Sequence, residues 1–298
     1  MHLRALRYFV TLAREGHFAR AAEQCGVTQP TLSSAIVALE QEIGKRLILR
    51  DRRYNGLTEE GKAMLPWAQQ MLAAHDGLLH AVDALAGPLH GEFRLGVIPA
   101  AIPAIGGFSQ ALFAAYPALS LSLRSLTSRE IVAGLHAFEL DAGITYLDHE
   151  PPGDMLSVSL YPERYFLVAA AGAGFDDRTS ISWTEAAEEP LCLLHQAMQN
   201  RRILDGCLAA RGLSVVPRAT ADSYVALLAL VRSGSFATIV PDRYRDLLDG
   251  ARWARFVPLE DAPPVSRVGL IVADRVLLSP IAAAALTAAQ HAARAEFD

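Results

Sequence analysis

Lysine is nearly absent from this 298-residue chain. It occurs only at Lys45 and Lys62, and arginine supplies the other fixed positive charges. We attribute this bias mainly to the base composition of the coding DNA. Cysteine is also scarce, and Cys25, Cys192 and Cys207 lack the paired spacing of a zinc site. Cys192 and Cys207 leave two interpretations open, a redox pair or two reduced structural thiols, and reduced thiols are favoured for a cytoplasmic protein.

Several other features are missing. No apolar run reaches membrane-spanning length, and the chain does not begin with a basic leader followed by an apolar core, so we expect a cytoplasmic protein with no membrane partner. The sequence also lacks a nucleophile elbow, a P-loop and a dinucleotide glycine fingerprint. Asp141 and His195 have no nucleophile placed beside them by any motif. We therefore expect no catalytic residues, no cofactor and no metal.

The charge is unevenly distributed along the chain. The formal net charge is −5, yet residues 1–58 contain nine Arg and Lys against five Asp and Glu. A basic head on an acidic body indicates phosphate binding by one module. The length suits two or three domains, and 52% hydrophobic residues allow a large core.

Residues 18–40, FARAAEQCGVTQPTLSSAIVALE, organise the rest of the chain. They predict a helix over residues 18–25, a tight turn at Gly26, and a second helix that Thr28 caps and Pro30 opens. The outward face of the second helix is small or hydrogen-bonding, which suits a DNA major groove. Its residues are Gln29, Thr31, Ser33, Ser34 and Ala38. The alternative is an ordinary helical hairpin with a glycine turn.

The next segments predict a wing and a long helix. Residues 50–56, RDRRYNG, form a polar hairpin with a turn at Asn55-Gly56, where the arginines would contact DNA or lie in a solvated loop. From residue 58 to 85, apolar residues recur every seven positions, as in a coiled-coil seam. They are Met64, Met71, Leu78 and Leu85. Pro66 predicts a kink or a late start of this helix.

Residues 1–61 resemble the N-terminal domain of the LysR-type transcriptional regulators. The matching pieces are LRALRYFVTLAREGHFARAAEQ, VTQPTLSSAIVALEQEIGKRLILR and LTEEGK. The resemblance implies a winged helix-turn-helix DNA-binding domain over 1–58 and a linker helix with a hinge over 59–87. It also implies a homodimer through that helix, a homotetramer, and binding of double-stranded promoter DNA. The expected DNA-binding residues are Gln29, Pro30, Thr31, Ser33, Ser34, Arg50, Arg52 and Arg53. The family usually has Ser where this chain has His17, which leaves the cap of the first helix open.

From Gly91 onward, strands and helices alternate, which predicts an α/β domain with mostly parallel sheets. The order of elements resembles the effector domain of the same family, two Rossmann-like lobes over residues 88–298. Lobe one would comprise 91–162 and 268–298, and lobe two 163–267, with crossings near 163–167 and 266–270. The expected fold is thus α/β with an all-α winged N-terminal domain, a long linker helix and a two-lobed effector domain.

A ligand pocket is expected between the lobes. In open α/β lobes, ligands lie beyond the carboxyl ends of the strands, where helix N-termini favour negative charge. We therefore expect a small anionic effector. The candidate residues are Pro99, Ala100, Thr127, Ser128, Thr145, Tyr146, His195, Gln196, Ser223 and Pro241. Thr127 and Ser128 could instead only cap their own helix, and His195 could be a surface residue. Relatives often have a hydroxyl at the position of Ala100.

These features predict a ligand-responsive regulator that binds DNA. The alternatives are an enzyme on the α/β domain, a cytoplasmic small-molecule-binding protein, or a protein that captures solutes for transport. The missing catalytic motifs disfavour an enzyme, and the basic head disfavours a solute carrier.

Overall fold

The computed structural model describes residues 2–50, 54–148, 153–260 and 266–295. The chain divides into two compact units, Met1–Gly87 and Pro88–Asp298, which are described separately. No helix in the described residues is long and apolar enough to cross a membrane.

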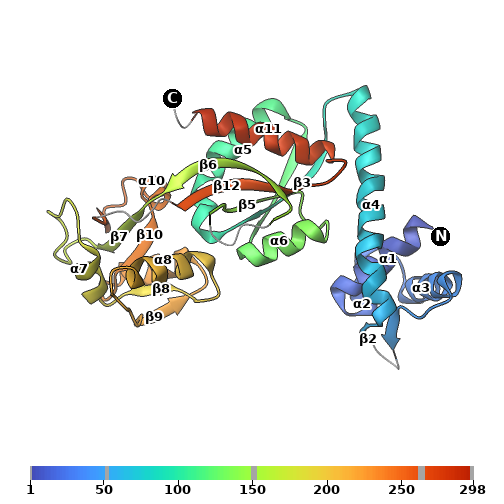
Figure 1. The fold of residues 1–298 in the computed structure, drawn as a ribbon, viewed down its shortest axis with the longest axis horizontal. Helices are drawn as coiled ribbons and strands as arrows, with labels where there is room; N and C mark the ends of the chain where they lie inside the picture. The colour runs from blue at the N-terminus through green and yellow to red at the C-terminus, as the bar shows by residue number, and fades with distance from the viewer. Residues whose placement is uncertain (1, 51–53, 149–152, 261–265, 296–298) are drawn as a thin grey trace. The chain divides into compact units, whose positions relative to one another are not determined.

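The first unit is a helical head with a two-stranded wing and a long helix (Figure 1). Its elements are α1 (Leu3–Glu15), α2 (Phe18–Gln24), α3 (Gln29–Ile43), β1 (Ile48–Arg50), β2 (Tyr54–Leu57) and α4 (Glu59–Ala86). The core is apolar and joins all four helices, with Phe9, Leu12, Leu32 and Ile36 fully buried. Ala21 and Ala22 are also buried, and their small side chains let α2 approach its neighbours.

The turn between α2 and α3 forms for the reasons that the sequence predicts. Gly26 has φ +65°, a left-handed conformation that glycine adopts at little cost. Thr28 caps α3, because its hydroxyl accepts a hydrogen bond from the Thr31 amide at 3.4 Å. His17 caps α2 in place of the usual serine: its Nδ1 accepts from the Ala19 amide at 3.2 Å. The cap of the first helix, which the sequence left open, is thus a histidine ring nitrogen.

The wing is present, but its turn differs from the prediction. Asn55 and Gly56 lie inside β2 and not at a turn, and Arg50 pairs with Tyr54. Gly56 has φ +119°, a conformation that favours glycine, and it lies within the strand. The connection, residues 51–53, lies outside the described residues. Glu40 holds the wing to α3, since its carboxylate accepts from the Leu47 and Ile48 amides at 2.9 and 3.2 Å.

Helix α4 begins early, and Pro66 does not delay it. Thr58 caps the helix by accepting from the Gly61 amide at 3.0 Å, and Pro66 lies within the continuous span that follows. The prediction of a late start was wrong: Pro66 is the eighth residue of the helix, and the helix continues through it although proline cannot donate the hydrogen bond to the carbonyl four residues earlier. Ala68 and Leu72 are buried against the head, while Leu78, Val82 and Leu85 beyond them are exposed.

The second unit has two lobes, and lobe one is built on a five-stranded sheet of order β4-β3-β5-β12-β6. Helices α5 and α11 cover one face and α6 the other (Figure 1). The elements are β3 (Gly91–Val97), the 3-10 helix η1 (Pro99–Ala104), α5 (Ile105–Ala115), β4 (Leu119–Ser125), α6 (Ser128–His136), β5 (Ala142–Tyr146), β6 (Met155–Glu163), β12 (Ser266–Ala273) and α11 (Pro280–Ala295).

Lobe two is built on a three-stranded sheet, β10-β7-β11, and a two-stranded one, β8-β9. The elements are β7 (Tyr165–Ala170), α7 (Trp183–Glu188), β8 (Cys192–Leu194), α8 (Gln199–Ala209), β9 (Ala219–Ala221), α9 (Tyr224–Arg232), β10 (Thr238–Pro241), α10 (Arg243–Leu247) and β11 (Ala254–Pro258). The chain enters this lobe at Arg164, between β6 and β7. It returns between β11 and β12, and Ser266 already pairs with Glu163 in lobe one.

The sheets are mixed, so the prediction of mostly parallel sheets was wrong. β3 pairs in parallel with β4 and β5, but β12 is antiparallel to β5 and β6. β7 is antiparallel to both β10 and β11. The antiparallel strands β7 and β12 are those that carry the chain between the lobes. Their direction is set by this passage and not by a strand-helix-strand crossover, which would make neighbours parallel.

Candidate DNA interface and interlobe cleft

Helix α3 presents an exposed polar surface at its N-terminal half. Gln29, Pro30, Thr31 and Ser34 are exposed, and Ser33 is half-buried. The opposite face is buried in the core through Leu32, Ile36 and Leu39, which have at most 1% exposure. Packing thus orients the helix so that its first turns face outward with amide and hydroxyl groups, the chemistry that can contact base edges.

Arg52 and Arg53 lie outside the described residues, as does the side chain of Arg50. Their proposed contacts with DNA therefore remain a prediction from the sequence.

A narrow cleft of about 230 Å³ lies between the two lobes. Lobe one contributes η1, the N-terminus of α6 and the end of β5, while lobe two contributes the end of β8 and the start of α8. The lining residues are Ile98, Pro99, Ala100, Thr127, Ser128, Tyr146, Leu194, Met198, Gln199 and Asn200. None of these side chains carries a formal charge, so the first turns of α6 and α8 supply the positive potential.

A chain of hydrogen bonds crosses this cleft. The Thr145 hydroxyl donates to Ser128 Oγ at 3.0 Å, and Ser128 Oγ donates to Gln199 Oε1. All three residues are buried, with exposures of 2%, 9% and 5%. Ser128 belongs to lobe one and Gln199 to lobe two, so this chain connects the lobes.

A second buried network lies beside the cleft and contains a carboxyl group. Tyr146 Oη donates to Glu163 Oε1 at 2.7 Å, and Asn200 Nδ2 donates to Tyr146 Oη at 2.6 Å. Tyr224 Oη donates to Asn200 Oδ1 at 2.6 Å. Burial raises the pKa of Glu163 to about 8, because the charged form loses its hydration. The nearby Glu163 and burial also raise the pKa of Tyr146.

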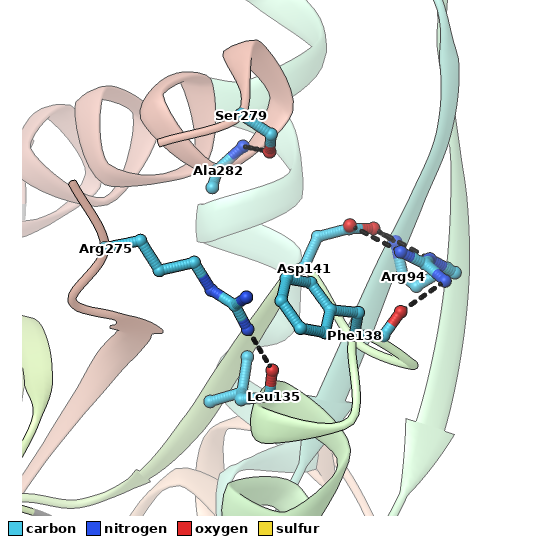
Figure 2. Close-up of polar contacts among 7 residues, drawn as sticks. All are labelled: Arg94, Leu135, Phe138, Asp141, Arg275, Ser279 and Ala282. Atoms are coloured by element: carbon cyan, nitrogen blue, oxygen red, sulfur yellow. Dashed lines mark hydrogen bonds and ion pairs between the residues drawn. The ribbon is translucent and has the colours of Figure 1, made fainter. Parts of the chain in front are cut away.

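Two arginines hold the C-terminal end of α6, opposite the end that carries Ser128. Figure 2 shows Arg275 lying over the Phe138 ring, at 3.3 Å from its centroid, while its Nη2 donates to the Leu135 carbonyl at 2.6 Å. Arg94 forms a two-pronged ion pair with Asp141 and also donates to the Phe138 carbonyl at 2.9 Å. Phe138 has φ +57°, an unfavourable conformation for a side chain of this size, and these contacts stabilise it.

The structure gathers some of the expected cleft residues and separates others. Pro99, Ala100, Thr127, Ser128 and Tyr146 line the cleft, and Thr145 lies directly behind Ser128.

Four other candidates are not among the lining residues. His195 and Gln196 are exposed, and His195 Nδ1 accepts from the Ala197 amide. Ser223 caps α9, and Pro241 pairs with Tyr165 in the buried lobe-two sheet.

The sequence analysis missed Gln199 and Asn200, because it chose His195 and Gln196, at the predicted strand end, as the polar residues of this segment, whereas the first residues of the helix that follows line the cleft. A polar pair at the start of a helix was the available signal.

The cysteines are free thiols. Cys192 is fully buried, and burial raises its pKa to about 11. Burial also raises the pKa of Cys207 above its ordinary value. Since the thiolate is the reactive form, both thiols have the environment of structural cysteines and not of a redox pair.

A winged helix-turn-helix joined to a two-lobed domain with a polar cleft defines a DNA-binding regulator that responds to a small molecule. The chain belongs to the LysR family: residues 3–62 match the bacterial regulatory helix-turn-helix protein of the lysR family, and residues 86–294 match the LysR substrate binding domain. These two matches confirm the family resemblance found in the sequence. They also confirm the prediction that the protein is a regulator and not an enzyme.

Curated relatives cover most of the chain. The probable hydrogen peroxide-inducible genes activator of Mycobacterium leprae is 31% identical over 238 residues, 79% of this chain and 76% of the relative. The HTH-type transcriptional regulator IlvR of Caulobacter vibrioides is 30% identical over 277 residues, 91% of this chain and 92% of the relative.

Solved structures share the fold over nearly the whole chain. A variant of full-length OxyR from Pseudomonas aeruginosa has a TM-score of 0.76 at 24% identity, covering 99% of this chain and 95% of that one. Full-length CbnR in complex with its target DNA has a TM-score of 0.70 at 23% identity, covering 98% and 100%.

Proposed function

We propose that this regulator binds promoter DNA through the exposed face of α3 and the wing, and that a small anionic metabolite in the interlobe cleft modulates the binding. The proposal places the protein in the cytoplasm, where the promoters of a bacterial cell lie. The exposed amide and hydroxyl groups on the first turns of α3, in a head whose sequence is basic, carry the DNA part. CbnR, which shares the fold, has been solved with its target DNA.

The effector part is supported by the polar lining of the cleft. Ser128 and Thr145 supply hydroxyls beside the N-terminus of α6, and Gln199 and Asn200 begin α8 on the other side. No formal charge lines the cleft, so an anion would bind through hydroxyl, amide and backbone donors.

Peroxide sensing by thiols is not proposed. Several relatives are described as hydrogen peroxide-inducible genes activators, but Cys192 and Cys207 here are buried or half-buried and have raised pKa values. A metabolite, and not an oxidant of these thiols, fits the chemistry of the cleft.

The DNA part is tested by binding to a fragment from the promoter beside the gene. We expect the affinity to fall steeply with salt, because each neutralised phosphate releases counterions. Each such phosphate contributes about −0.9 to the slope of the logarithm of the binding constant against the logarithm of the salt concentration. Gln29→Ala should lower the ratio of promoter to random-DNA affinity about tenfold. Gln41→Ala, an exposed glutamine at the other end of α3, is the matched control and should leave the ratio unchanged. Salt-independent binding, or an equal loss on both DNAs with Gln29→Ala, would contradict this reading.

The effector part is tested by screening small carboxylates and inorganic anions for a shift in the thermal melting of the full chain. Ser128→Ala should remove the response to any compound found, because the hydroxyl that faces the cleft is gone, and should preserve DNA binding. A response that survives in Ser128→Ala would place the effector outside this cleft.

A further inference from the structure

The cleft already contains an acceptor group of its own. Gln199 Oε1 accepts a hydrogen bond from Ser128 Oγ, which in turn accepts from the Thr145 hydroxyl at 3.0 Å. Gln199 is 5% exposed and is one of the residues that line the cleft. Its side-chain oxygen therefore takes the place that an acceptor atom of a ligand would need in order to reach Ser128.

The small size of the cleft is consistent with the Gln199 side chain already filling part of it. Of its roughly 230 Å³, which includes open solvent, only about 10 Å³ accepts the centre of a water-sized sphere, which is room for about one water molecule. The two residues that meet across it come from different lobes: α6 packs on β5 and β3, and α8 packs on β8. Their hydrogen bond therefore links the two lobes directly.

We propose that Gln199 is a built-in occupant of the effector site, whose side-chain amide holds the lobes closed until a carboxylate-bearing effector displaces it from Ser128. A carboxylate presents the same planar pair of atoms as an amide, and it adds a negative charge that the N-termini of α6 and α8 favour. The effector class is thus a molecule that ends in a carboxylate. This inference rests on the proposed function, because it concerns the regulation of the same cleft.

Other contacts across the lobes make the displacement possible without complete separation. Tyr244 Oη donates to the Pro99 carbonyl at 2.8 Å, and Asn200 Nδ2 donates to Tyr146 Oη at 2.6 Å. Neither contact involves Gln199, so the lobes keep two anchors when its side chain leaves. The expected effect of a Gln199 substitution is therefore a loosened cleft in a folded domain.

The experiment removes the Gln199 side chain and offers acetate from solution in its place. Full-length Gln199→Ala is melted in sodium acetate and in sodium chloride at equal ionic strength and neutral pH. In chloride, we expect Gln199→Ala to melt a few degrees below the wild type. Acetate should raise the melting temperature of Gln199→Ala, and the acetate concentration needed should be about tenfold lower than for the wild type. Gln199→Met fills the same space without an acceptor, so it should melt below the wild type and show no response to acetate. Gln110→Ala, an exposed glutamine on α5, should behave as the wild type.

The donor is tested in the same background. Adding Ser128→Ala to Gln199→Ala should abolish the response to acetate. An acetate response that is equal in the wild type and Gln199→Ala, or one that persists without the Ser128 hydroxyl, would overturn the inference. Either result would leave the proposed function intact if another compound still shifted the wild type through Ser128. Failure of the proposed function would appear differently, as the absence of salt-dependent promoter binding or of any Ser128-dependent ligand.

Discussion

At the scale of single residues, Glu163 is a carboxyl group in an environment that favours its neutral form. It is 3% exposed and lies where the chain passes from lobe one to lobe two. The titratable groups that interact electrostatically with Glu163 are five tyrosines, one carboxyl group and one thiol. They are Tyr146, Tyr161, Tyr165, Tyr224, Tyr244, Asp242 and Cys207, and Arg243 lies over the Tyr161 ring. The carboxyl is therefore stable in its neutral form.

This environment predicts that the effector domain loses stability as the pH rises. Burial raises the pKa of Glu163 from 4.5 to about 8, so the unfolded chain releases a proton over an interval in which the folded chain retains it. The contribution of Glu163 to the free energy of unfolding is highest below pH 4.5, falls by at most about 1.4 kcal/mol per pH unit between these values, and levels off above about pH 8. Melting of the effector domain at about pH 5.5 and about pH 7.5 measures the fall.

Glu163→Gln is the variant that isolates this group. It keeps the shape of the side chain and cannot ionise, so its melting temperature should fall less than that of the wild type over the same interval. Asp242, whose carboxyl pKa is also raised by burial, contributes equally to both proteins. Equal pH dependence in the wild type and Glu163→Gln would show that Glu163 is ionised in the folded chain.

At the scale of elements, the joint between the wing and α4 depends on a close approach of two backbones. A Cβ added at Gly61 would lie 2.1 Å from the Leu47 carbonyl oxygen. The same carbonyl accepts from the Thr58 amide at 3.0 Å, so it cannot move without a loss of that hydrogen bond. The helix start and the wing thus share one tightly packed corner.

Gly61→Ala should therefore destabilise the head by about 2–3 kcal/mol or more, because a backbone atom blocks the new methyl group. Gly77→Ala is the matched control in the same helix, since no atom lies within 4 Å of the added Cβ. It should stabilise the helix by up to about 1 kcal/mol. Urea unfolding followed by far-ultraviolet circular dichroism compares the two variants, and equal stability would disprove the close contact.

The elements also show how far sequence alone reaches. Thr28 as the cap and Pro30 in the first turn placed the start of α3 within one residue. The short elements β11 and α10 escaped prediction, because segments of five residues have no clear period.

Sequence alone did not predict the antiparallel direction of β7 and β12 or the position of Gln199 in the cleft. Both depend on how the two lobes meet. Such pairings join residues distant in sequence, as in Ser128 with Gln199, and no local pattern encodes them.

At the scale of the whole molecule, the free end of α4 carries an apolar stripe that the described head does not cover. Leu78, Val82 and Leu85 are 61%, 56% and 89% exposed. Together with Met71 they continue the heptad seam, whose ordinary partner is a second helix of the same kind. A dimer through this seam would carry two α3 helices to one DNA site, so that a single chain's modest affinity is multiplied.

Leu78→Glu should therefore weaken promoter binding even though it lies far from α3 in sequence. The charge would face its own copy across the seam, which favours the monomer, and the loss of the second head should lower affinity about a hundredfold at nanomolar protein concentrations. Sedimentation velocity measures the dimer, and fluorescence anisotropy with a promoter fragment measures the affinity. His80→Glu adds the same charge to the opposite side of the helix and should leave both unchanged. If Leu78→Glu remained a dimer and bound as the wild type does, assembly would not depend on this stripe, and the pairing of the heads would have to arise in the effector domain.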